Sequence, residues 1–219
     1  MLRSHSLITL FSLLTLALAA CGGSIGSGPS TPGTPLPLSA TVEGYNGGEG
    51  TVTAKMQTSL ANVASGTISA EGAFTLELPG SLVPNQLVAS AESFPCSTDT
   101  LTYSAPDAAA DFLTNPEVIQ GSEAVGTLSL SNRASDAAGL ELGSKEVFPV
   151  YSSGALTVSG ICTDAELGNV TTYDVTLEPG WNYVLQELTD NLGTAATYSV
   201  VAEVPADVTW RFVSTVVSP

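Results

Sequence analysis

Apolar and polar residues alternate along most of the chain after residue 38. The period of two is clearest over residues 51–56, 74–78, 128–130, 156–162, 173–177, 181–185 and 196–200. Apolar side chains at every second position mark a strand that buries one face. Turns rich in glycine and proline separate these runs at intervals of about 8 to 12 residues, which is typical of sandwiches. The pattern predicts an all-β fold, an antiparallel β-sandwich of one or two β units.

The C-terminal strands carry the most specific expectations. Leu156, Val158, Gly160 and Cys162 share one face of a strand, so Cys162 is expected to point inward. Pro149 lies within a short strand over residues 147–151. Because proline cannot donate to a strand ladder, that strand is expected at a sheet edge or a bulge.

Two successive strands near the C-terminal end are expected to form a hairpin. Their apolar residues all fall on odd numbers, and a loop with an odd number of residues keeps both sets on one face. A three-residue loop sets Leu177 opposite Trp181 and Val175 opposite Tyr183.

The first 20 residues predict a secretory signal helix. Arg3 is basic, and the apolar stretch from Leu7 to Leu18 is too short for a permanent membrane helix. The sequence Leu18-Ala19-Ala20-Cys21 resembles the lipobox of bacterial lipoproteins. The resemblance implies cleavage before Cys21 and attachment of acyl chains to that cysteine. The alternative is an ordinary signal peptide cut near Ala20, which leaves Cys21 as a free thiol.

The lipobox resemblance implies a location as well. The protein would be exported and lipid-anchored to the cell envelope, at the outer membrane or the outer face of the cytoplasmic membrane. Gly22 follows the cysteine where an Asp would retain such a protein in the inner membrane, so the outer membrane is favoured in two-membrane bacteria. Residues 21–38 are rich in Gly, Ser, Thr and Pro and predict a disordered tether.

Three further regions follow the signal peptide (1–20) and the lipidated tether (21–38). They are an N-terminal β unit over 39–95, a connecting region with short strands over 96–145, and a C-terminal β unit over 146–219. Around residues 38–90, the stretches Ser39-Ala40-Thr41-Val42-Glu43-Gly44 and Gly72-Ala73-Phe74-Thr75-Leu76 resemble the carboxypeptidase-regulatory-like and transthyretin-like modules. The resemblance implies a small Ig-like or transthyretin-like sandwich without catalytic activity.

Charge narrows the range of partners. Removing the signal leaves four basic side chains against 21 acidic ones, a formal net charge of −17. Such a field repels phosphate backbones and anionic headgroups, so no nucleic-acid partner is expected. The membrane is expected to be reached through the N-terminal lipid alone.

Cys96 and Cys162 are the remaining cysteines once Cys21 is lipidated. An even pair in an exported protein predicts a disulfide bond. The alternative is two separate buried thiols.

Candidate chemistry is sparse. The sole histidine, His5, lies in the signal, so the mature chain has no histidine base or ligand. No catalytic residue, cofactor or metal site is therefore predicted. Calcium is the alternative use of carboxylates, with Asp107 and Asp111, or Asp164 and Glu166, as oxygen ligands.

Aromatic residues in the C-terminal strands allow two interpretations. Trp181, Tyr183, Tyr198 and Trp210 would form a sugar-stacking platform if they faced solvent, but aromatics at strand spacing more often belong to a core. The sequence thus favours a non-catalytic structural or interaction lipoprotein, with an envelope protein or carbohydrate as partner. The alternative is a surface module that binds carbohydrate or calcium.

Overall fold

The structure is a computed structural model, and it describes residues 33–94, 96, 100–133, 141–164, 167–190 and 192–215. Strands make up most of these residues, so the all-β prediction is confirmed. The described part has two short helical segments, the 3-10 turn η1 (Pro84–Gln86) and the single turn α1 (Ser90–Ser93). The predicted signal peptide and Cys21 lie outside the described residues.

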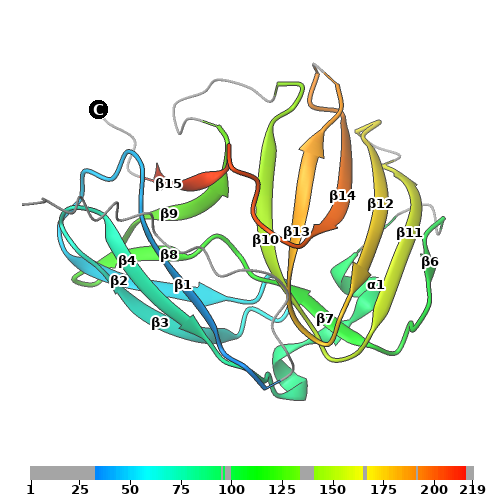
Figure 1. Ribbon diagram of the computed structural model, residues 1–219, viewed down its shortest axis with the longest axis horizontal. Helices are drawn as coiled ribbons and strands as arrows, with labels where there is room; N and C mark the ends of the chain where they lie inside the picture. Colours follow the sequence, from blue (N-terminus) through cyan, green and yellow to red (C-terminus); the bar gives the residue numbers. More distant parts are fainter. Residues whose placement is uncertain are drawn as a thin grey trace, which may run out of the picture.

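Seven strands pair around the N-terminal part of the molecule (Figure 1). In the order in which they pair, they are β1 (Leu36–Thr41), β4 (Ala73–Leu78), β3 (Asn62–Ile68), β2 (Gly50–Lys55), β8 (Glu117–Gln120), β9 (Glu123–Ser131) and β15 (Thr209–Ser214). Just after β1, the Glu43 N–H donates to the Trp210 carbonyl at 2.8 Å, and the Phe212 N–H donates to the Glu43 carbonyl at 3.1 Å. This isolated bridge sets the residue Glu43, just beyond β1, against β15 at the other end of the pairing order.

The two stretches behind the transthyretin-like resemblance lie side by side. β1 and β4 are antiparallel partners, with Leu38 opposite Leu76 and Ala40 opposite Phe74. Leu38, Phe74 and Leu76 are all buried. The alternation in each stretch therefore marks the inner face of one strand pair.

A second group of strands, most of them C-terminal, extends the same sheet. Their order is β10 (Lys145–Ser152), β13 (Gly180–Leu188), β14 (Ala195–Val201), β12 (Val170–Leu177), β11 (Leu156–Thr163) and β6 (Thr102–Tyr103). A single register pair, Glu146 opposite Ser131, connects β10 to β9. β7 (Ala109–Phe112) pairs with β10 and with the two-residue strand β5 (Val88–Ala89).

The expected hairpin of β12 and β13 is wrong. β14 lies between them, parallel to β12 with Tyr173 opposite Tyr198, and antiparallel to β13. Leu177 therefore faces Leu156 of β11, and Trp181 faces Tyr151 of β10. Alternation fixes which face of a strand is buried but leaves its neighbours open, and here a later strand takes the place between two earlier ones. The sheet is consequently mixed instead of antiparallel throughout.

The expected edge position of Pro149 is also wrong, although its missing N–H does mark a boundary. β10 pairs with β13 along its whole length on one side. On the other side it pairs with β9 at Glu146 and with β7 from Val150 onward. The Pro149 carbonyl accepts from the Leu113 N–H at 2.8 Å, so the absent donor falls where the partner strand changes.

Two apolar cores hold these strands together. The larger includes Leu38, Phe74 and Trp210 from the first group of strands together with Trp181 and Tyr183 from β13. The smaller lies beneath the C-terminal sheet. Its buried members are Phe94, Ala110, Phe112, Val150, Leu156, Val158, Val175, Leu177 and Val184. The strands pack face to face around these cores, in keeping with the expected sandwich.

Candidate functional site

The predicted disulfide is present. Cys96 and Cys162 are bonded, with their Cα atoms 5.6 Å apart. Cys162 is 8% exposed on the same buried face of β11 as Leu156 and Val158, so its inward orientation is confirmed. The bond joins the segment after α1 to the C-terminal sheet.

Gly160 allows this segment to approach β11 closely. Its φ is +133°, and a Cβ placed there would lie 2.7 Å from the Thr100 carbonyl oxygen. Only glycine adopts such a backbone angle without strain and leaves that space free. The Thr100 hydroxyl donates a hydrogen bond to the Ile161 carbonyl beside it. The Cys96–Cys162 bond and the glycine at position 160 therefore both keep the chain near Cys96 and Thr100 close to β11.

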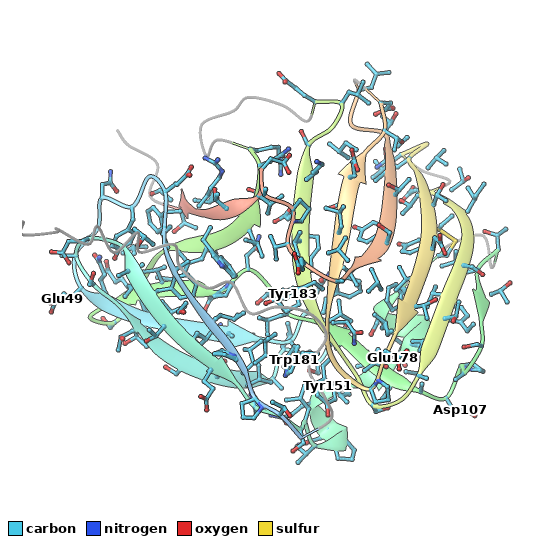
Figure 2. The ribbon with its side chains drawn as sticks, in the orientation of Figure 1. Glu49, Asp107, Tyr151, Glu178, Trp181 and Tyr183 are labelled. Carbon is cyan, nitrogen blue, oxygen red and sulfur yellow. A yellow bond between two sulfur atoms is a disulfide. The ribbon has the colours of Figure 1, made fainter. Side chains whose placement is uncertain are left out.

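The aromatic platform built on the tryptophans is wrong, and their assignment to the core is confirmed. Trp181, Tyr183 and Trp210 are 0%, 1% and 2% exposed. Figure 2 shows Trp181, Tyr183 and Tyr151 in the middle of the molecule, between the N-terminal and C-terminal strands. The Trp181 indole donates to the Pro79 carbonyl at 2.8 Å. These rings link the two groups of strands and offer no surface to a sugar.

The burial of the Tyr183 hydroxyl is energetically unfavourable. Neither its hydroxyl nor the Trp210 indole N–H has a hydrogen-bond partner within the described residues. Burial raises the pKa of Tyr183 to about 12, since the phenolate would lose its hydration there.

Tyr198, the fourth predicted aromatic, lies elsewhere and is half-buried. It lines a pocket of ≈ 270 Å³ that opens beside the smaller core. The other lining residues are Gln57, Ser93, Phe94, Phe112, Phe148 and Tyr173. This pocket is the candidate functional site of the molecule.

Strand register brings the pocket rings together. The pairing of β12 with β14 sets Tyr173 beside Tyr198, and their rings stack at 5.1 Å with an interplanar angle of 19°. Phe94 meets Tyr173 edge-on at 5.9 Å, and Phe112 meets Tyr198 edge-on at 6.4 Å. The sequence did not indicate these five rings as one group, because they come from the C-terminal end of α1 and from the strands β7, β10, β12 and β14. The alternation did show Tyr173 on its strand's inner face.

The tyrosine hydroxyls of the pocket stay protonated. Burial is the main cause that raises the pKa of Tyr173, with Tyr103 nearby as a second cause. Burial also raises the pKa of Tyr198, followed by the effects of Tyr173 and of the Glu146 carboxylate. The pocket therefore presents neutral phenols and ring faces.

Of the two predicted carboxylate pairs, Asp107 and Asp111 do not form a calcium site. Asp111 is fully buried, and its two oxygens accept backbone N–H groups of Thr58, Ser59 and Phe112 at 2.9–3.2 Å. Asp107 is exposed, at the outer edge of the molecule in Figure 2. Glu166, the proposed partner of Asp164, lies outside the described residues. The described ranges contain no cluster of three or more His, Cys, Asp or Glu side chains suited to a metal ion.

All four basic residues beyond the signal contact carboxylates. Lys55 lies 2.6 Å from Glu117, Lys145 lies 3.0 Å from Asp207, and Arg211 lies 2.7 Å from Glu43. Arg133 approaches Glu146 at 3.9 Å. The hydrogen bond from Lys145 is the main cause that lowers the pKa of Asp207.

Comparison with known proteins gives no relative on which to base an assignment. No family model, curated protein or solved structure matches the chain. Among the residues that the structure describes, no helix is long and apolar enough to cross a membrane.

Proposed function

We propose that the protein is an exported lipoprotein that displays a non-catalytic, disulfide-linked β domain at the surface of the cell envelope. The observation that carries this is the lipobox-like Leu18-Ala19-Ala20-Cys21 directly after a short apolar stretch. Acyl chains on Cys21 would anchor the chain, since each buried CH₂ contributes about 0.8 kcal/mol.

The disulfide supports export. Cys96 and Cys162 are 66 residues apart in sequence and bonded in the fold. Structural disulfides persist in the oxidising compartments outside the cytoplasm and are rare inside it. The same bond uses the only other cysteines of the mature chain, so a cysteine nucleophile has no place in this function.

The combination of an anchor, a tether and a folded domain suits contact with a partner more than catalysis. The tether predicted over residues 21–38 ends earlier than expected, because β1 begins at Leu36. The Pro- and Gly-containing stretch before β1 would hold an acidic domain away from the membrane. The proposed role is structural or interactive, with an envelope protein as the partner. An envelope carbohydrate is the second partner class.

Lipidation is tested by a single substitution. Mass spectrometry of the membrane fraction should find an N-terminus at Cys21 that carries acyl chains. Cys21→Ala should move the protein from the membrane fraction to the soluble exported fraction, while Ser24→Ala, a matched change in the tether, should not. An unlipidated Cys21, or a Cys21→Ala protein that remains equally membrane-bound, would refute the anchor.

The absence of catalysis is tested separately. The purified chain should turn over no member of a panel of glycosides and esters. Turnover that disappears when one Asp or Glu is changed to its amide would show that the protein is an enzyme after all.

A further inference from the structure

We propose that the aromatic pocket binds a methylated ammonium group, such as the head of a choline- or betaine-like compound. The proposal does not depend on the lipid anchor. It follows from the shape, composition and charge of the pocket.

The first argument is the surface of the pocket. Five rings line it, those of Phe94, Phe112, Phe148, Tyr173 and Tyr198. Most of their contacts are edge-to-face at centroid distances of 5.0–6.4 Å, so rings meet at steep angles and form walls instead of a flat platform. Ring faces carry partial negative charge and attract a cation within about 6 Å of the centroid.

The second argument is charge. No Lys, Arg or charged acid belongs to the described lining of the pocket. The mature chain carries a net charge of −17, which concentrates cations near its surface and repels anions. The Glu146 carboxylate is close enough to influence Tyr198, although Arg133 stands 3.9 Å from one of its oxygens. An anionic ligand would find no counter-charge in this pocket.

The third argument is the scarcity of hydrogen-bonding groups. The Ser93 hydroxyl already donates to the Ala110 carbonyl. The exposed Gln57 amide and the two tyrosine hydroxyls are the other polar groups of the described lining. A sugar, or an ammonium group that keeps its N–H bonds, would leave several polar groups without partners. A methylated ammonium presents only C–H groups and needs no such partners.

The size of the pocket is compatible with this ligand. The volume of ≈ 270 Å³ exceeds the roughly 150 Å³ of an apolar cavity that holds benzene. A trimethylammonium head with a short attached chain therefore fits.

The test compares choline with 3,3-dimethylbutan-1-ol, which has the same shape without the charge. Titration of the full disulfide-bonded chain, followed by NMR or calorimetry, should show choline binding in the millimolar range. The neutral compound should bind about tenfold more weakly or not at all, because it lacks the cation–π attraction. Equal or tighter binding of the neutral compound would show that the pocket recognises apolar groups without regard to charge, and would overturn the proposal.

Substitutions at half-buried rings localise the site. Tyr198→Leu and Phe148→Leu should each weaken choline binding about tenfold, while Tyr198→Phe, which keeps the ring, should leave it within about twofold. Tyr45→Leu is the matched control, since Tyr45 is half-buried against Phe212, outside this pocket. Circular dichroism and melting curves would show that each variant is folded.

Two further results would contradict the proposal. One is no choline binding up to about 50 mM, well above the expected millimolar affinity. The other is binding of glucose, used as a neutral sugar, in preference to choline. The Cys21→Ala fractionation is independent of either outcome, so failure of the pocket and failure of the anchor are distinguishable.

Discussion

The buried hydroxyl of Tyr183 gives the first prediction at the scale of single residues. The side chain is 1% exposed, and its hydroxyl has no partner in the described part of the chain. Tyr183→Phe removes an uncompensated polar group and should raise the free energy of unfolding at neutral pH by about 1 kcal/mol. Urea denaturation measures this difference. A loss of stability beyond about 1 kcal/mol would mean that the hydroxyl is satisfied in solution.

The same residue predicts a dependence on alkaline pH. In the unfolded chain a tyrosine ionises near pH 10, whereas Tyr183 in the folded protein has a pKa of about 12. Above pH 10 the unfolded state therefore binds fewer protons than the folded state, so stability falls as pH rises through this window. Tyr183→Phe should make the fall shallower, and unchanged slopes between pH 10 and 12 would contradict the assignment.

The hydrogen bonds of Asp111 give another prediction for the free energy of unfolding. Its carboxylate receives the Thr58, Ser59 and Phe112 N–H groups and ties the β2–β3 turn to β7. Asp111→Asn places an amide donor among these donors and should cost about 2–4 kcal/mol in the free energy of unfolding. The exposed Asp107→Asn is the control and should stay within about 0.5 kcal/mol. Similar losses for both variants would exclude the special role of Asp111.

At the scale of elements, the disulfide connects the segment after α1 to β11. It closes a sequence separation of 66 residues, for which the chain-entropy model gives about 4 kcal/mol. Cys96→Ser with Cys162→Ser should therefore lower the melting temperature markedly, and dithiothreitol should do the same to the unchanged protein. The double variant should not respond to dithiothreitol. If reduction left the melting temperature of the unchanged protein intact, the bond would contribute little.

At the scale of the whole molecule, the shared core predicts cooperative unfolding. Trp181 and Tyr183 of β13 lie in one core with Leu38 and Phe74 of the N-terminal strands, and the Trp181 indole donates to the Pro79 carbonyl, directly after β4, at 2.8 Å. Neither group of strands keeps its buried face covered without the other, so one transition is expected in calorimetry, with equal calorimetric and van't Hoff enthalpies. Tryptophan fluorescence and far-ultraviolet dichroism should give the same midpoint. Two separated transitions would show independent units.

The sequence by itself determined the strand content, the buried faces and the disulfide. Alternation is a local property, so it placed Cys162, Trp181, Tyr183 and Trp210 on inner faces that are indeed buried. The disulfide could be predicted from the number of cysteines and the expected export alone, and the bond is present. The lipobox and its cleavage site remain predictions of the sequence, outside the residues that the structure describes.

Only the tertiary structure decided which strands are neighbours. β14 lies between β12 and β13, and Pro149 marks a change of partner on an internal strand, because hydrogen-bond pairing depends on strands distant in sequence. The burial of Asp111 and the aromatic pocket follow from that pairing as well. Tyr173 and Tyr198 stack because β12 and β14 run parallel in one register, which no local pattern of residues encodes.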